Sequence, residues 1–182
     1  MAFTHRTVSL VPHPDTPAKG IYGIDVRWFE TGDGRLVLRW LIKGVAALAI
    51  PPFAGKGRAD DLWRTTCCEL FLKDRMGGGY REFNFSPSDR WAAYRFDGYR
   101  EGMAEAEIPA PEVSSDCGQH LFVLTALLDA AILQGSNLAG LSAVIDEKDG
   151  TRSYWALAHP PGKADFHDPA CFALPLPARE TA

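Results

Sequence analysis

The chain of 182 residues lacks a hydrophobic run long enough to cross a bilayer. Its longest apolar stretch, VAALAIPPFA at 45–54, contains Pro51 and Pro52, whereas a spanning helix needs about 20 consecutive apolar residues. The first residues, MAFTHRTVSLVPHPD, also lack the basic and apolar regions of a secretory signal. We therefore expect a cytoplasmic protein with no membrane partner.

A cluster of basic residues is missing as well. The 19 Lys and Arg residues are outnumbered by 23 Asp and Glu residues, which gives a formal net charge of −4. Nucleic acids and anionic lipid surfaces are bound through dense positive patches. We therefore expect no nucleic-acid partner.

Common motifs of catalysis and metal binding are also absent. The chain has no CxxC, HxH or HExxH pattern, and no GxSxG elbow, Walker loop or GxGxxG after an expected strand. Its four cysteines are Cys67, Cys68, Cys117 and Cys171. Adjacent cysteines on a strand face opposite sides and make a poor disulfide pair. We expect reduced, mostly buried thiols.

Glycine and proline, in contrast, are frequent. The 17 glycines and 13 prolines separate many short apolar runs, which is typical of all-β proteins. We expect one domain over residues 1–182, an antiparallel β-sandwich of jelly-roll or immunoglobulin-like type with about ten strands. The main expected strands are 21–30, 35–44, 67–73, 80–86, 90–99, 120–129, 138–147 and 151–159, with a tight turn at Asp33-Gly34 between the first two. The run 121–134 also fits a helix, but aromatic and β-branched residues in its first half favour a strand and a turn at Asp129.

The stretch 63–103 is the most informative part of the chain. Because side chains alternate along a strand, Cys67, Glu69 and Phe71 should share one face, and Cys68, Leu70 and Leu72 the other. In the next strand Tyr80, Glu82, Asn84 and Ser86 oppose Phe83 and Phe85. Carboxylates, an amide, a hydroxyl and aromatic rings then lie on one face. This combination is typical of a surface that binds a small ligand.

Three motifs carry a family resemblance. They are LW-x(3)-C-x-E-x-F at 62–71, EFNFSPSxRWAAYxFDGYRxGM at 82–103, and AVIDE…YWALAHP…DFH…CF at 143–172. With these motifs the chain resembles the bacterial DOMON-like proteins, which are similar to family 9 carbohydrate-binding modules and to DOMON cytochrome domains. The resemblance implies a β-sandwich of ten or eleven strands that holds sugar or haem, and it implies no catalytic activity.

Sugars are held by rings that stack on their C–H faces and by carboxylate or amide groups that bond their hydroxyls. The alternative is structural: Trp91, Tyr94 and Phe96 would fill the core, and both glutamates would pair with Arg64, Arg81 or Arg95. The candidate ligand-binding residues are Trp63, Glu69, Glu82, Asn84, Trp91, Tyr94, Tyr99 and Trp155.

Other chemistries stay open. If Glu69 and Glu82 come within about 5 Å, they would resemble the carboxylates of a retaining glycosidase. Haem would need axial ligands, for which Met76, Met103, His120, His159 and His167 are candidates. Calcium, which related modules carry, would need oxygen ligands such as Asp146, Glu147, Asp149, Asp165 and Asp168, although turn solvation also explains these acids.

The function we expect is non-catalytic binding of a small ligand, most simply a carbohydrate or a sugar-containing metabolite. A haem-binding electron-transfer module and a protein-interaction scaffold without a small ligand are the alternatives. Exposed edge strands would also allow a homodimer. The proline-rich tail after residue 159 is expected to cover an edge strand, with a lid over the ligand as the alternative.

Overall fold

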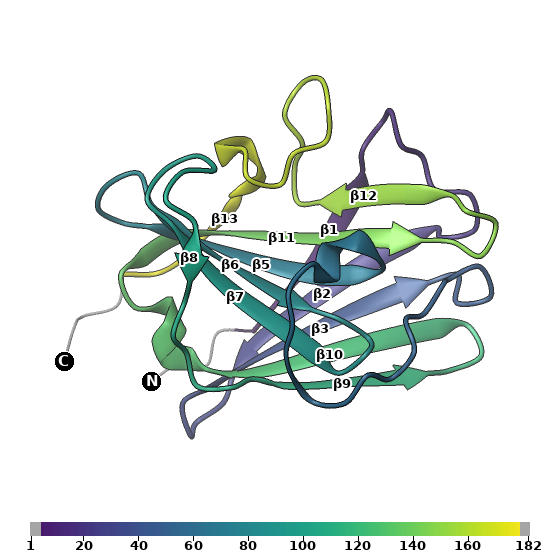
Figure 1. The fold of residues 1–182 in the computed structure, drawn as a ribbon, viewed down its shortest axis with the longest axis horizontal. Coiled ribbons are helices and arrows are strands. Elements are labelled where there is room, and N and C mark those ends of the chain that lie inside the picture. Colours follow the sequence, from purple (N-terminus) through teal and green to yellow (C-terminus); the bar gives the residue numbers. More distant parts are fainter. Residues whose placement is uncertain (1–4, 179–182) are drawn as a thin grey trace.

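The computed structural model describes residues 5–178, so both ends of the expected 1–182 domain lie outside the described residues. Within this range the fold is all-β, with no α-helix and three short 3-10 helices (Figure 1). The strands are β1 His5–Pro12, β2 Gly23–Glu30, β3 Arg35–Lys43, β4 Gly57–Arg58, β5 Cys67–Asp74, β6 Tyr80–Phe85, β7 Arg90–Phe96, β8 Ala104–Glu105, β9 Glu112–Cys117, β10 Leu121–Asp129, β11 Ser136–Asp146, β12 Arg152–Ala156 and β13 Leu174–Pro175. The 3-10 helices are η1 Leu62–Arg64, η2 Ala130–Leu133 and η3 Pro169–Cys171.

The strands form one continuous curled sheet, a half-barrel. Its order is β4-β7-β6-β5-β11-β12-β1-β2-β3-β10-β9, with β8 added to β7 and β13 to β11. Among these pairs, only the short β4–β7 pair is parallel. Strand β1 joins the two halves, because residues 5–10 pair with β2 while Val11 and Pro12 pair with β12. The all-β prediction is confirmed, and the sandwich or jelly-roll arrangement stays a prediction.

We call β1, β2, β3, β10 and β9 half A, and the strands from β4 to β12 in the sheet order, with β8 and β13, half B. The main hydrophobic core contains residues of both halves. Trp40 of β3 meets Phe85 of β6 at 5.8 Å between ring centroids. The expected alternation is confirmed, because Cys68, Leu70, Leu72, Phe83 and Phe85 all lie in this core. Each such side chain contributes roughly 1.5–3 kcal/mol on burial.

Local turn chemistry explains several elements. Gly34 adopts a φ of 81° between β2 and β3, as the expected Asp33-Gly34 turn requires. Strand β10 ends at Asp129, whose carboxylate accepts a hydrogen bond from the Ala131 backbone N–H at 2.8 Å and caps η2. Sequence reasoning missed β1, because most of its side chains are polar or exposed and give little hydrophobic alternation.

Residues 159–172, which we call the strap, lie across the outer face of half B, beyond β11 and β12 (Figure 1). Phe166 and Phe172 of the strap pack in a second cluster with Phe71, Tyr80 and Phe96 of the sheet. The tail therefore covers a face of the sheet. The expectation that it mainly covers an edge strand was wrong, although β13 just beyond it pairs with the first part of β11.

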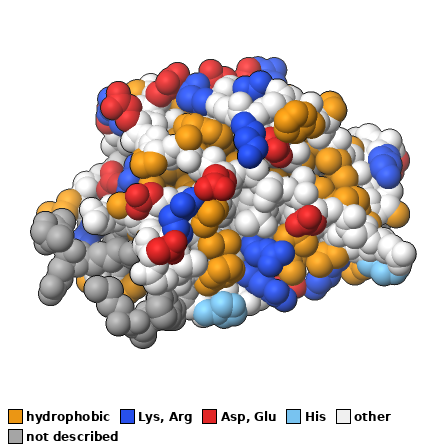
Figure 2. Space-filling model, turned by 90° about the horizontal axis from the view of Figure 1, so that it is seen from below, with side chains coloured by type: hydrophobic (Ala, Val, Ile, Leu, Met, Phe, Trp, Pro, Cys, Tyr) orange, Lys and Arg blue, Asp and Glu red, His pale blue; other side chains and the backbone are white. Residues whose placement is uncertain are grey.

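In the part of the chain that the structure describes, no helix combines the length and the apolar character that a membrane span needs. The face shown in Figure 2 carries acidic and basic side chains interspersed with hydrophobic ones, and neither sign of charge dominates it.

The strap can approach the sheet closely because residue 140 is a glycine. A Cβ at Gly140 would lie 2.9 Å from Phe172 Cδ1 and 3.1 Å from the Cys171 carbonyl oxygen. Gly140→Ala should therefore lower the free energy of unfolding by about 1–3 kcal/mol through overpacking, as measured by urea denaturation. Gly78→Ala is the control, because its added Cβ would lie 3.6 Å from the nearest atom. Equal effects of the two substitutions would contradict this account of the strap.

Candidate functional site

A cavity of about 890 Å³ opens on the outer face of half B. The sheet supplies its floor. Its walls come from the β1–β2 loop, the segment around η1, the loop after β7 and the strap, with lining residues that include His13, Trp63, Arg100 and His167. The volume lies within the range of about 300–1,000 Å³ that is usual for small-ligand pockets.

Two buried carboxyl groups line the floor. Glu69 on β5 is 3% exposed and Glu82 on β6 is 6% exposed. The strand register pairs Glu69 with Asn84 and Phe71 with Glu82. The two glutamates are therefore diagonal neighbours on the same face of adjacent strands.

Each carboxylate has neutral hydrogen-bond partners. Asn84 Nδ2 donates to Glu82 Oε1 at 2.7 Å, and Ser142 Oγ donates to Glu69 Oε2 at 3.3 Å. Within the described residues, the arginines of the structural alternative are engaged elsewhere: Arg64 pairs with Asp61, Arg95 pairs with Asp97, and Arg81 donates to Ser136. The alternative of an ion-pair network around Glu69 and Glu82 is therefore not observed.

Burial dominates the electrostatics of this pair. Desolvation raises the pKa of Glu69 well above its ordinary value, and the nearby charge of Glu82 raises it further. Desolvation also raises the pKa of Glu82, against the opposing effects of the Asn84 hydrogen bond and the charge of Arg100. The pair therefore retains protons to a higher pH than exposed carboxyl groups do.

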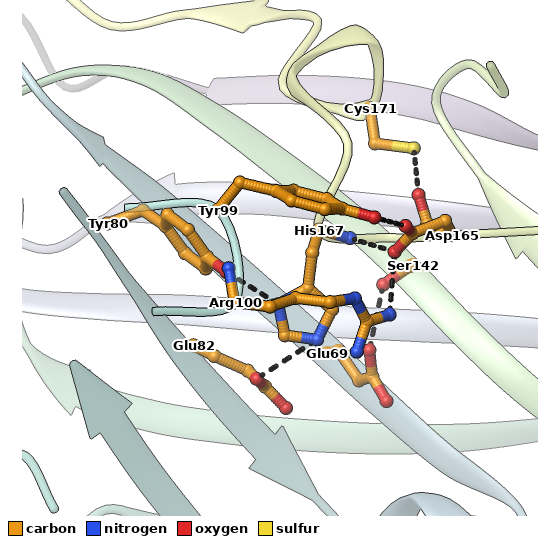
Figure 3. Close-up of polar contacts among 9 residues, drawn as sticks. All are labelled: Glu69, Tyr80, Glu82, Tyr99, Arg100, Ser142, Asp165, His167 and Cys171. Carbon is orange, nitrogen blue, oxygen red and sulfur yellow. Dashed lines mark hydrogen bonds and ion pairs between the residues drawn. The ribbon is translucent and has the colours of Figure 1, made fainter. Parts of the chain in front are cut away.

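His167 of the strap lies above this floor (Figure 3). The Tyr80 hydroxyl oxygen accepts a hydrogen bond from the Arg100 backbone N–H and lies 2.7 Å from His167 Nδ1. A tautomer with the ring proton on Nε2, 3.6 Å from Glu82 Oε2, allows the Tyr80 hydroxyl to donate to Nδ1. Burial lowers the pKa of His167 to about 4, so the ring is neutral at pH 7.

Asp165 fixes the strap to the loop after β7. Its carboxylate accepts hydrogen bonds from Arg100 at 2.7 Å, from the Tyr99 hydroxyl, and from the His167 backbone N–H at 3.0 Å (Figure 3). The loop itself turns tightly at Gly102, which has a φ of 63° and where a Cβ would clash with Asp97. Segments 65 residues apart in the chain thereby form one wall of the cavity.

Aromatic rings supply the apolar part of the lining. Tyr94, Phe96, Tyr154 and Phe166 surround the cavity, and Trp63 at its margin is 48% exposed. The Tyr94 hydroxyl donates to Asp60 at 2.5 Å, and burial together with that carboxylate raises the pKa of Tyr94. The Tyr94 ring is thereby held in one orientation at the cavity wall.

The structure brings together four of the residues expected from the sequence: Trp63, Glu69, Glu82 and Tyr94 line the cavity. Asn84 lies beneath the surface, where it orients Glu82. Tyr99 is not among the lining residues, and it acts through Asp165.

Trp91 and Trp155 require correction, because both lie outside the cavity. Trp155 is buried in the main core, where its Nε1 donates to Ser153 Oγ at 3.0 Å, and Trp91 packs against the same core. The reason is strand alternation: the ring facing the cavity from β12 is Tyr154, and those from β7 are Tyr94 and Phe96.

Sequence reasoning did not place Arg100, His13 or Phe166 at the site. These residues come from loops and from the strap, and only the tertiary packing of half B brings them together. The sequence did indicate that Tyr154 was a candidate, because adjacent strand residues face opposite sides and one of Tyr154 and Trp155 had to face away from the core.

The haem candidates are only partly brought together. Met103 and His167 line the cavity, but Nδ1 of His167 is engaged by Tyr80 and Nε2 faces Glu82. Met76 is 84% exposed, and His159 Nε2 bonds the Val11 carbonyl oxygen. The residues present therefore do not fit a haem with two protein ligands.

The acids proposed for calcium have other partners. Asp146 pairs with Arg152, and Glu147 accepts hydrogen bonds from the backbone N–H groups of Lys19 and Gly20. Across residues 5–178, no group of three or more His, Cys, Asp or Glu side chains is placed to hold a metal ion. Turn and loop stabilisation accounts for the observed contacts of Asp146 and Glu147.

The fold is similar to that of a crystal structure from Bacteroides uniformis ATCC 8492, a protein provisionally assigned to carbohydrate binding. The two structures agree with a TM-score of 0.64 at 15% sequence identity, over 92% of this chain and 84% of the other. At this identity the likeness concerns the fold alone. No protein-family model and no curated protein matches the chain.

The carboxyl pair predicts a pH-dependent stability difference. Because the pKa of Glu69 is raised in the folded state, the folded protein binds this proton more tightly than the unfolded chain does. The stabilisation that protonation provides is fully present below the ordinary glutamate pKa of about 4.3 and is lost as pH rises. The free energy of unfolding of Glu69→Gln, relative to that of wild type, should therefore increase as pH rises from about 4 to about 8, as measured by urea denaturation. Glu112→Gln, which changes an exposed carboxylate, is the control. A matching trend in the control would contradict this interpretation.

The contacts of Asp165 predict a local effect on the strap. Asp165→Asn should weaken the bonds to Arg100 and Tyr99 and raise the opening of residues 159–172, measured by hydrogen exchange, by roughly fivefold, or about 1 kcal/mol. Asp97→Asn is the control. Asp97 lies on the same loop after β7 as Arg100, and its ion pair with Arg95 is exposed. Unchanged exchange in the strap of Asp165→Asn would show that its apolar packing alone holds it.

Proposed function

We propose that the protein binds a carbohydrate or a sugar-containing metabolite in this cavity. The observation that carries the proposal is the composition of the cavity, in which rings from Trp63, Tyr94 and Tyr154 surround the buried carboxyl groups of Glu69 and Glu82. A sugar presents apolar C–H faces and a rim of hydroxyls, and this lining offers contacts for both.

Polar atoms without partners support the same proposal. His13, which lines the cavity, accepts a hydrogen bond from the Asp15 backbone N–H on Nδ1, so its neutral ring carries the proton on Nε2. His13 Nε2 and Thr16 Oγ1, both in the lining, have no hydrogen-bond partner among the described residues. Buried polar groups of this kind are usually satisfied, so a small movement of the lining that brings these two atoms to the cavity surface would allow ligand hydroxyls to bond them.

The similarity in fold to a protein assigned to carbohydrate binding adds weak support, as do the sequence motifs that resemble DOMON-like proteins. Haem binding is less favoured, because both nitrogens of His167 already face polar groups. The single-domain organisation, the cytoplasmic location and a homodimer stay predictions from the sequence.

A panel of mono- and oligosaccharides and nucleotide sugars should contain compounds that raise the thermal midpoint, because a ligand stabilises the state that binds it. Trp63→Ala should weaken the best hit by roughly 2- to 10-fold in calorimetric titration, since ring contacts contribute about 0.5–1.5 kcal/mol. The same mixtures should be analysed for hydrolysis products, which would identify an enzyme.

Tyr22→Ala is the matched control, since Tyr22 is 71% exposed and lies outside the cavity. The proposal fails if no compound on the panel binds. It also fails if the affinity of every hit is the same in wild type, Trp63→Ala and Glu82→Gln.

A further inference from the structure

We propose that the ligand carries a protonated amine, as an amino sugar with a free amino group does, and that this ammonium group lies between Glu69 and Glu82. The inference rests on the proposed function and specifies the chemical class of its ligand. It is argued from the charges of the cavity and from the hydrogen-bonding capacity of its floor.

The lining of the cavity is strongly acidic. Among the described residues, the lining contains six carboxyl groups and two residues with permanent positive charge, Arg100 and Lys163. A concave site with this excess of carboxylates attracts cations and repels phosphorylated or carboxylated ligands. The lining carboxylates are Asp15, Asp60, Asp61, Glu69, Glu82 and Asp165.

Asp60 and Asp165 are ion-paired within the protein, whereas the charge of Arg100 acts on Glu69 and Glu82 only from beyond ion-pair distance. Asp60 binds Arg58 and Tyr94, and Asp165 binds Arg100. Among the described residues, no Lys or Arg nitrogen lies within 4.0 Å of Glu69 or Glu82, and His167 near Glu82 is neutral at pH 7. Burial favours the protonated form of these two glutamates, and a ligand ammonium would supply the counter-charge that stabilises their ionised form.

The floor also has the acceptors that an ammonium needs. An ionised carboxylate has about four acceptor positions, and the structure shows one hydrogen bond from Asn84 to Glu82 and one from Ser142 to Glu69. An ammonium has three donors and no acceptor, so it can bond both carboxylates at once. An N-acetyl group lacks the charge, and a hydroxyl supplies only one donor.

The test compares glucosamine, glucose and N-acetylglucosamine, with their short β-1,4 oligomers, by calorimetric titration at pH 6.5 and fixed ionic strength. The free amine should bind at least tenfold more tightly than both neutral compounds. In Glu69→Gln and Glu82→Gln, which retain the shape of the side chain, this preference should fall at least fivefold. Binding of the neutral compounds should change by less than about threefold. Glu112→Gln removes an equal charge from half A and should leave the preference unchanged.

The outcomes separate this inference from the proposed function. If neutral sugars bind as well as the amine, or if the preference persists in both glutamine variants, the amine inference is wrong and sugar binding stands. If no sugar binds, but spermidine binds and depends on Glu69 and Glu82, the sugar assignment is overturned and recognition of an amine is supported. If none of these compounds binds, both proposals fail.

Discussion

The alternation of side chains in β5, β6 and β7 is the constraint on which the rest of this structure depends. One face of these strands packs in the main core through residues such as Leu70 and Phe83, and the other carries Glu69, Glu82 and Tyr94. A shift of one residue in register would send every one of these side chains to the opposite face. The same pairing therefore determines both the stability of half B and the chemistry of its outer surface.

Half B is unusual in that both of its faces are covered. The strap adds a second apolar cluster over Phe71, Tyr80 and Phe96, and its packing excludes solvent from the two glutamates. Burial of charged groups opposes folding, and the core of the curled sheet must offset it. In the free protein the two glutamates accept hydrogen bonds only from Asn84 and Ser142 among the described residues, whereas a ligand that donates hydrogen bonds would add partners for their remaining acceptor positions.

The sequence predicted the faces of the strands well because alternation is a local property. It placed Glu69 and Glu82 on the same surface, and the turns at Gly34 and Asp129 where the structure has them. It did not place Trp91 and Trp155 correctly, because a large aromatic ring fits a core as well as a binding surface. Which of the two a ring faces depends on which of the alternating positions of the strand it occupies. The contributions of Arg100 and His13 depend on which loops meet over the sheet, and no local pattern encodes that.

The strap follows β1 to β12 in chain order, and this order has a consequence for biosynthesis. His167 contacts Tyr80 across 87 residues, and Arg6 at the other end donates to the carbonyl of Pro175 across 169 residues. A ribosome adds residues from the N-terminus onward, so the sheet can begin to assemble while the wall of the cavity is still inside the exit tunnel. The nascent chain thus completes the cavity only after residues 159–172 have emerged and packed on the sheet.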